Sequence, residues 1–289
     1  VNGKSIADYS QRGVITPDHT IRTKNWPLIL PPPQAGAEAD FSEAARAAAA
    51  TFIAEYRDYF ARNNARVGGT RIMLDPAPRV ALVPGLGLFG MGTNAKAASV
   101  AADLAQAAVE TITDAEASGH FESISEADMF DCEYWPLEQA KLGAAKLLPL
   151  AGQVAVITGG GGAIGAATAL AFVKAGAEVA LLDRDLAAAQ KQAKAAGSAA
   201  LALTCDVTDA DSVREAFAQV VAKFGGVDIL VSNAGAAWQG KIGEVDEATL
   251  RESFELNFFA HQKVAQAAVK IMLSQGSGGC LLFNVSKQA

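Results

Sequence analysis

The sequence predicts an α/β protein in which a doubly wound parallel sheet follows a smaller α/β segment. Residues 154–157 form a short apolar, β-branched run that breaks into four consecutive glycines and resumes as an alanine-rich helical stretch at 163–175. A second apolar run, 178–182, ends on an acid, and strand-like and helix-like stretches then alternate to the end of the chain. Such alternation is typical of parallel sheets, which bind ligands at the carboxyl ends of their strands.

The order of strand, glycine loop, helix, strand and acid over residues 154–185 is the fingerprint of a dinucleotide-binding βαβ unit of the Rossmann type. Glycines allow a tight turn and let backbone N–H groups approach a pyrophosphate at the positive end of the helix. Asp183 is placed to accept hydrogen bonds from ribose hydroxyls and to repel a 2′-phosphate. We therefore predict NAD as the cofactor, with Arg184 as the neighbour that opposes this preference.

The predicted cofactor residues of this unit are Thr158, Gly159, Gly161, Gly162, Ile164, Gly165, Asp183 and Arg184. A glycine pattern alone would also fit an ordinary turn, but here the flanking strand, helix and acid all agree with the nucleotide site.

Bulk properties exclude several classes of function. The formal charge is -7 and no basic cluster stands out, which disfavours nucleic acid as a partner. The three cysteines and three histidines are scattered, so the sequence predicts no disulfide framework and no metal site, and a reducing cytoplasm fits best. No apolar run reaches membrane-spanning length, and the first residues do not resemble a signal peptide.

The first half begins with residues 1–35, which show little periodicity and end in three prolines. They are predicted to form an extended strap or the tail of an upstream domain, with His19 as a polar loop residue rather than a ligand. Residues 41–62 then place aromatic side chains at helical spacing, which predicts an amphipathic helix whose aromatic stripe belongs to the core.

A strand at 79–83 and a helix at 94–118, capped by Thr93 or Asn94, are expected next. The glycines between them lack the lysine and serine of a phosphate loop, so we expect them to turn the chain between two short strands. Ser125 and Asp128 form a capping-box pattern, an aromatic helix is expected around Tyr134 and Trp135, and 146–152 is predicted to be a linker.

The second half continues with helices expected at 186–196, 210–224 and 248–273 and strands at 200–204, 228–232 and 279–285. Polar or glycine residues follow the strands: Asp183, Asp206, Asn233 to Gly235, and Ser286. Any one of them alone fits a helix cap or a turn. Their occurrence after four strands of one sheet predicts a ligand site at that edge.

These motifs resemble the short-chain dehydrogenase/reductase family. Thr158, Gly159 and Gly165 match its TGxxxGxG loop, with Ala163 in place of the middle glycine. Asp206 and Val207 resemble the pair that holds the adenine, and Asn233, Ala234 and Gly235 resemble the end of the NNAG motif, with Ser232 in place of its first asparagine.

The resemblance also implies catalytic residues. Asn257 matches the asparagine of the family's catalytic tetrad, and Ser286 matches its serine, although many members carry that serine where this chain has Lys287. In the family, a tyrosine donates the proton, a lysine lowers the pKa of that tyrosine, the serine polarises the carbonyl and the asparagine positions a relay water.

The family's YxxxK motif would follow the serine by about a dozen residues. None of the four tyrosines of this chain is followed by lysine at the fourth position. We therefore expect the sequence to be a fragment of a longer protein, with a sheet that is incomplete at its C-terminal end and with no useful rate of hydride transfer on its own.

The segment 36–145 resembles the C-terminal part of the class II sugar-phosphate aldolase fold, although Leu86 stands where that family has a zinc-binding histidine. With the dehydrogenase segment 153–289, it resembles the bifunctional rhamnulose-1-phosphate aldolase/short-chain dehydrogenase family of bacterial rhamnose breakdown. The resemblance implies an NAD-linked reaction of a small aldehyde or alcohol such as lactaldehyde, and a homo-oligomer in the full-length protein. Two alternatives remain: a non-catalytic cofactor-binding or scaffold protein, and an aldolase, which the missing histidine cluster opposes.

Overall fold

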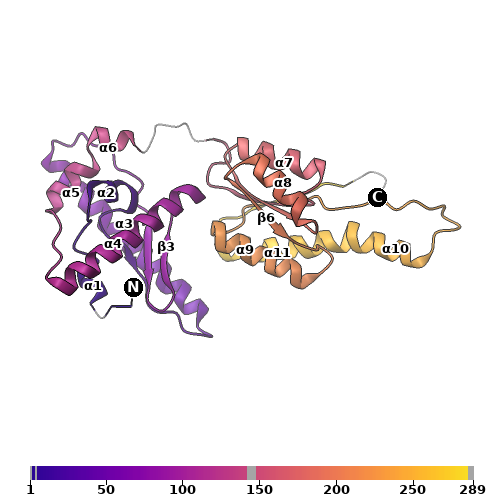
Figure 1. The fold of residues 1–289 in the computed structure, drawn as a ribbon, viewed down its shortest axis with the longest axis horizontal. Helices are drawn as coiled ribbons and strands as arrows, with labels where there is room; N and C mark the ends of the chain where they lie inside the picture. The colour runs from indigo at the N-terminus through magenta and orange to yellow at the C-terminus, as the bar shows by residue number, and fades with distance from the viewer. Residues whose placement is uncertain (1, 4, 142–147, 286–289) are drawn as a thin grey trace. The chain divides into compact units, whose positions relative to one another are not determined.

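The computed structural model describes residues 2, 3, 5–141 and 148–285 (Figure 1). Its internal contacts divide the chain into two compact units, residues 1–145 and 146–289. The predicted linker, 146–152, begins outside the described residues.

Unit 1 is built around a three-stranded sheet in the order β1-β2-β3, with β1 parallel to β2 and β2 antiparallel to β3. Its strands are β1 (Leu28–Ile29), β2 (Val80–Val83) and β3 (Gly87–Gly90). Its helices are α1 (Ile6–Tyr9), α2 (Pro17–Thr23), α3 (Glu38–Arg66), α4 (Ala95–Ser118), α5 (Glu126–Glu133) and α6 (Pro136–Ala140). The predicted helix at 41–62 and the predicted hairpin are confirmed, and the helix is longer at both ends.

The prediction of an extended strap over residues 1–35 is wrong, because this stretch contains α1, α2 and β1. The prediction of His19 as a polar loop residue is also wrong. It is buried on α2, with Nδ1 2.7 Å from the Thr16 hydroxyl and Nε2 3.1 Å from the Leu104 carbonyl oxygen. Both ring nitrogens therefore have a structural role, since Nε2 joins α2 to α4 and Nδ1 contacts the N-cap residue of α2 itself.

The glycines between β2 and α4 serve the backbone, as predicted. Gly85 and Gly87 have positive φ angles of 87° and 136° in the turn between the two strands. A Cβ atom at Gly90 would lie 2.2 Å from the Ala98 carbonyl oxygen, so only glycine lets β3 approach α4 this closely. Asn94 caps α4 by accepting a hydrogen bond from the Ala97 N–H, and the Ser125 hydroxyl caps α5 in the same way.

The expected aromatic helix around Tyr134 and Trp135 is not formed. Helix α5 ends at Glu133, and α6 begins at Pro136. The cause is Pro136, since the residue before a proline avoids the helical conformation and proline suits the first position of a new helix.

A buried charged network lies in the core of unit 1. Glu133 is fully buried and accepts hydrogen bonds from Tyr56 (2.6 Å) and Tyr59 (3.0 Å). Its partner is the buried Lys24, whose ammonium lies 3.7 Å from the Glu133 carboxylate and 3.8 Å from the centroid of the Tyr56 ring. Lys24 has a φ of 67°, a conformation that L residues rarely adopt, so this backbone is strained.

This network predicts a rise of stability with pH. Burial lowers the pKa of Lys24 from its usual 10.5 to about 8, the facing charges being Glu133, Arg79 and Asp75. Above pH 8 the folded lysine releases its proton before the unfolded chain does, so the unfolded state binds more protons and the free energy of unfolding rises. The rise should end near pH 10, where unfolded tyrosines ionise while burial raises the pKa of Tyr56 and Tyr59 in the fold.

The measurement is the urea midpoint at several pH values between 7.5 and 9.5. A Lys24→Met variant should lose the rise, and a midpoint that falls over this range in the unaltered protein would contradict the prediction.

Unit 2 is a five-stranded parallel sheet in the order β6-β5-β4-β7-β8, which confirms the predicted doubly wound fold. Its strands are β4 (Val154–Thr158), β5 (Glu178–Asp183), β6 (Ala200–Thr204), β7 (Ile229–Ser232) and β8 (Cys280–Phe283). Its helices are α7 (Ala163–Lys174), α8 (Leu186–Ala196), α9 (Ala210–Phe224), α10 (Glu247–Phe254) and α11 (Ala260–Gln275), with a π-helix, η1 (Glu255–Phe259), between the last two.

Alternate residues of the central strands pack on opposite faces of this sheet. Val156, Leu182 and Leu230 contact the core beneath α9 and α11, whereas Ile157 and Leu181 contact the core beneath α7 and α8. Figure 1 shows these two helix pairs on either side of the strands. Because both faces are covered, the strands are continuous apolar runs, the pattern that made them recognisable in the sequence.

The helix expected at 248–273 is interrupted, which corrects the prediction. Residues 255–259 form η1, where the hydrogen bonds widen by one residue between α10 and α11. Among the residues that the structure describes, no helix combines the length and apolar character needed to cross a membrane.

Candidate functional site

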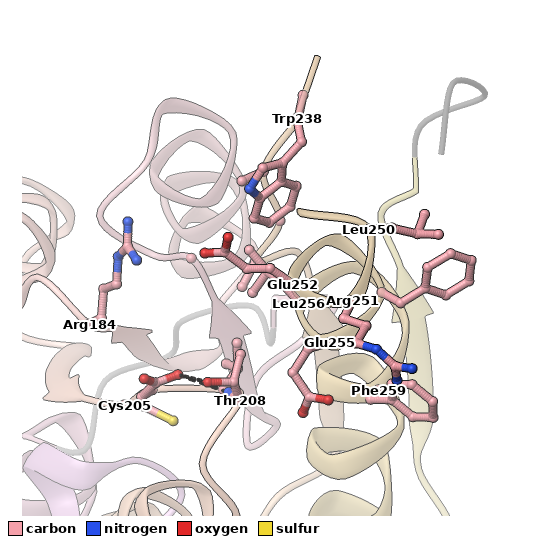
Figure 2. Close-up of a pocket in the computed structure, with 18 of the residues that line it drawn as sticks. Arg184, Cys205, Thr208, Trp238, Leu250, Arg251, Glu252, Glu255, Leu256 and Phe259 are labelled. Atoms are coloured by element: carbon pink, nitrogen blue, oxygen red, sulfur yellow. Dashed lines mark hydrogen bonds between the residues drawn. The ribbon is translucent and has the colours of Figure 1, made fainter. Parts of the chain in front are cut away.

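A pocket of about 1230 Å³ opens at the carboxyl ends of β4, β5, β6 and β7 (Figure 2). β4 lies in the middle of the sheet, and the chain turns from one side of it to the other, which is where doubly wound folds bind ligands. The walls are Gly159, Asp183, Arg184, Cys205, Asp206, Val207, Thr208, residues 234–238, Glu247, Leu250, Arg251, Glu252, Phe254, Glu255, Leu256 and Phe259.

The loop between β4 and α7 owes its shape to glycine. Gly159 has a φ of 65°, and a Cβ atom there would lie 3.0 Å from Ala234 Cα. A Cβ at Gly165 would lie 2.4 Å from the Gly159 carbonyl oxygen, and one at Gly160 would lie 2.7 Å from Leu181. Gly160, which was not among the predicted cofactor residues, is therefore as restricted as its neighbours.

Helix α7 starts without a side-chain cap, since its N-cap residue is Gly162. The next three helices are each capped by an aspartate side chain, from Asp185, Asp209 and Asp246. The first N–H groups of α7 thus retain their hydrogen-bonding capacity at the positive end of the helix dipole, a combination that suits an anion.

Asp183 is held in a fixed position at the end of β5. Its carboxylate accepts hydrogen bonds from the Gly161 N–H (2.9 Å) and the Asp185 N–H (3.0 Å). Each oxygen has one backbone donor and keeps a second lone pair for a ligand. Arg184 is exposed and stands on one side of the pocket, with Leu250 and Phe259 on the other (Figure 2).

Asp206 and Val207 follow β6, as the sequence indicated. The Asp206 carboxylate accepts hydrogen bonds from the Thr208 hydroxyl (2.7 Å) and the Thr208 N–H (2.9 Å). These bonds, followed by the charges of Arg184 and Lys263, hold the pKa of Asp206 below its usual value. Val207 is buried in the core and also lines the pocket.

Thr158 and Asn233 support the site from behind. The buried Thr158 hydroxyl accepts hydrogen bonds from the N–H groups of Asn233 (2.9 Å) and Ala234 (3.0 Å). The Asn233 side chain donates to the Thr158 carbonyl oxygen and accepts from Asn284 at 2.7 Å. The ends of β4, β7 and β8 are thereby tied together, which fixes Ala234 and Gly235 at the pocket wall.

Asn257 lies within η1, at the widened turn of the helix. Its amide accepts a hydrogen bond from the Ala236 N–H (3.2 Å) and donates one to the Ala236 carbonyl oxygen (2.8 Å). This two-point contact fixes the segment that follows Gly235. The side chain of Asn257 therefore holds the backbone of the pocket wall in place and does not itself line the pocket.

The predicted cofactor residue Ile164 has a side chain that is 63% exposed and does not line the pocket. The predicted catalytic residue Ser286 lies outside the described residues, as does Lys287. Gly161 and Gly165 lie behind the lining residue Gly159 at positions where a Cβ atom would come within 2.8 Å and 2.4 Å of other atoms, whereas a Cβ atom at Gly162 would come no closer than 3.4 Å.

Sequence reasoning missed several residues at or beside the site. Trp238, Glu252 and Glu255 line the pocket, and the Ser232 hydroxyl lies 2.6 Å from His261 Nδ1. His261 comes one helical turn after Asn257, a spacing that could have directed attention to it. The residues of α10 that form one wall of the pocket match no known motif, so the sequence did not indicate them.

Within the described part of the chain, no three His, Cys, Asp or Glu side chains are grouped so as to hold a metal ion. Leu86, at the position of the expected zinc histidine, is exposed at the turn before β3. The absence of a transition-metal site stays a prediction.

The residues present fit a dinucleotide. Three features occur together at one edge of the sheet. They are a glycine loop whose space side chains would fill, a helix that starts without a side-chain cap, and a fixed carboxylate at the end of β5. These are the features that bind the pyrophosphate and the adenosine ribose.

Comparison with known proteins agrees with both halves. Residues 1–142 match the family model described as aldolase class II, second domain, and residues 153–289 match that described as short chain dehydrogenase. The chain is 34% identical over 299 residues to the uncharacterized oxidoreductase YuxG of Bacillus subtilis, an alignment that covers 100% of this chain and 42% of that protein. It is 36% identical over 140 residues to a sorbitol dehydrogenase of Cereibacter sphaeroides, covering 48% of this chain and 54% of the relative.

A solved structure of a short-chain type dehydrogenase/reductase from Mycobacterium marinum is 36% identical, with a TM-score of 0.47 over 48% of this chain and 58% of that one. The chain spans about half the length of the curated relatives it matches. Each half of the chain is therefore similar to one family model, residues 1–142 to the class II aldolase second domain and residues 153–289 to the short-chain dehydrogenases, and the second similarity implies NAD or NADP as the cofactor.

Proposed function

We propose that unit 2 is the NAD(H)-dependent oxidoreductase domain of a fused aldolase/dehydrogenase, and that it transfers hydride to or from a small hydroxyaldehyde or alcohol. The observation that carries the proposal is the Asp183 carboxylate, which two backbone N–H groups hold in the pocket wall beside the glycine loop. The proposed substrate is lactaldehyde in rhamnose breakdown, which rests on the family resemblance. Because one relative is a sorbitol dehydrogenase, sugar alcohols are the substrates against which lactaldehyde should be compared.

A bound nicotinamide cofactor would supply or accept the hydride. The residues of this chain bind and orient it. The uncapped N–H groups of α7 hold the pyrophosphate, Asp183 accepts from the ribose hydroxyls, and Asp206 and Val207 form the adenine end. Asn257 fixes the backbone at Ala236, and Ser286, by resemblance, polarises the substrate carbonyl.

We predict tighter binding of NAD than of NADP. Asp183 accepts from both ribose hydroxyls but repels a 2′-phosphate, and repulsion of about 1 kcal/mol corresponds to a preference of about fivefold. Calorimetric titration of the protein with each cofactor measures the gap. Asp183→Ala should narrow it and the neighbouring Arg184→Ala should widen it, because the arginine can pair with the phosphate. Equal or tighter NADP binding by the unaltered protein would sink the assignment.

The second candidate is a non-catalytic cofactor-binding or scaffold role. The Asn257 amide forms hydrogen bonds with the Ala236 backbone, and a scaffold protein would also use such a contact. The discriminating experiment is NADH-dependent reduction of lactaldehyde, with sugar ketones as comparison, by this chain and by a longer chain that supplies the tyrosine and lysine of a YxxxK motif, because this chain alone is expected to show no useful turnover. Turnover by the longer chain that Asn257→Ala lowers supports the enzyme. Tight NADH binding by both chains without turnover of any carbonyl compound supports the scaffold.

A further inference from the structure

Lys263, on the first turns of α11, lies directly behind the pocket wall. Its ammonium donates a hydrogen bond to the Thr208 carbonyl oxygen at 2.9 Å and forms an ion pair with Glu255. Both partners line the pocket, whereas Lys263 does not. Its side chain is 28% exposed, so its charge is partly withdrawn from water. Figure 2 shows Thr208 and Glu255 on neighbouring parts of the wall.

We propose that Lys263 is a positioning residue for cofactor binding, which joins the adenine end of the pocket to the π-helix and neutralises Glu255. The inference rests on the proposed function, because it concerns how the same pocket accepts a dinucleotide.

The first argument is geometric. Thr208 holds the Asp206 carboxylate through two hydrogen bonds, and Lys263 in turn holds the Thr208 carbonyl oxygen. Glu255, the other partner of Lys263, begins η1, two residues before Asn257. One ammonium therefore connects the loop after β6 with the helix turn that clamps the opposite wall.

The second argument is electrostatic. The pocket wall carries five carboxylates, from Asp183, Asp206, Glu247, Glu252 and Glu255, and two guanidinium groups, from Arg184 and Arg251. Arg251 pairs with Glu247. A dinucleotide brings two further negative charges on its pyrophosphate, so an unpaired Glu255 would add repulsion in a partly desolvated site. The positive charge of Lys263 offsets the negative charge of Glu255, so the ligand meets less repulsion in the pocket.

The experiment is a fluorescence titration of NADH with the unaltered protein, Lys263→Met, Glu255→Gln and the double variant. Lys263→Met should weaken binding about tenfold or more, because it leaves a charge without its partner. Glu255→Gln should tighten binding rather than weaken it, and the double variant should return to within about threefold of the unaltered protein. The effect of Lys263→Met should shrink as salt is added. Lys270→Met, an exposed lysine on the same helix, is the matched control.

A merely structural lysine would not give this pattern, since the second substitution would add to the first instead of reversing it. Unchanged affinity of Lys263→Met, or a double variant as weak as Lys263→Met, would overturn the inference while leaving NADH binding by the unaltered protein intact. Failure of the unaltered protein to bind NADH would instead overturn the proposed function, and this inference with it.

Discussion

Replacement of Glu133 by leucine is expected to lower the free energy of unfolding of unit 1 by about 3 to 5 kcal/mol, the cost of leaving one partner of a buried ion pair alone. Lys24 would keep its buried ammonium without its nearest counter-charge, and the hydroxyls of Tyr56 and Tyr59 would lose the carboxylate that accepts their hydrogen bonds. Urea denaturation followed by the fluorescence of Trp26, which packs against Tyr59, measures the loss.

Glu126→Gln, at the opposite end of α5, is the matched control. Its ion pair with Arg62 is solvent-exposed on both sides, so its loss should cost less than about 1 kcal/mol. The double variant Lys24→Met/Glu133→Leu should regain much of the stability, because removing both charges also removes the desolvation penalty. If Glu133→Leu and Glu126→Gln lower the free energy of unfolding equally, the buried network contributes no more to stability than an exposed ion pair does, and the prediction is wrong.

The second half of the fold could be predicted because its signals are local. Helices α8 and α9 and strand β6 begin and end where the sequence predicts, since glycines and capping aspartates mark their ends. The π-helix could not be predicted in the same way. A run of apolar residues at helical spacing does not reveal one widened turn, and the contact that uses it, between Asn257 and Ala236, joins residues on different elements.

The prediction of an extended strap over residues 1–35 is wrong for a related reason, because long-range contacts decide the structure of this stretch. Three prolines and weak periodicity favour an extended chain, yet the burial of α2 depends on contacts with distant residues such as Leu104. The charged network of Lys24, Tyr56 and Glu133 likewise joins three separate elements. Such contacts exist only once the chain has folded, and single-sequence patterns do not encode them.

At the candidate site, the residues that follow strands were the predictable part. Asp183, Asp206, Ala234 and Gly235 come together because parallel strands end at the same edge of the sheet. The wall contributed by α10, together with Lys263 behind it, was not predictable. Nothing in the sequence near Lys263 shows that its ammonium will meet a carbonyl oxygen 55 residues earlier in the chain.

Substitution of Gly165 by alanine is expected to weaken NADH binding by about tenfold to a hundredfold, because overpacking of a closed site costs about 1 to 3 kcal/mol. The new Cβ would lie 2.4 Å from the Gly159 carbonyl oxygen and 3.0 Å from Gly160 Cα. Both contacts are backbone, so the loop itself must move. Gly159 lines the pocket, and the displacement is therefore transmitted to the surface that meets the pyrophosphate.

Gly162→Ala is the matched control within the same loop. Its φ of -78° suits any residue, and its new Cβ would come no closer than 3.4 Å to the Gly159 carbonyl oxygen. Its affinity for NADH should stay within about threefold of the unaltered protein, which is less than 1 kcal/mol. Circular dichroism confirms that both variants remain folded. If Gly165→Ala and Gly162→Ala bind NADH equally well, the close approach of α7 to the glycine loop does not control the cofactor site.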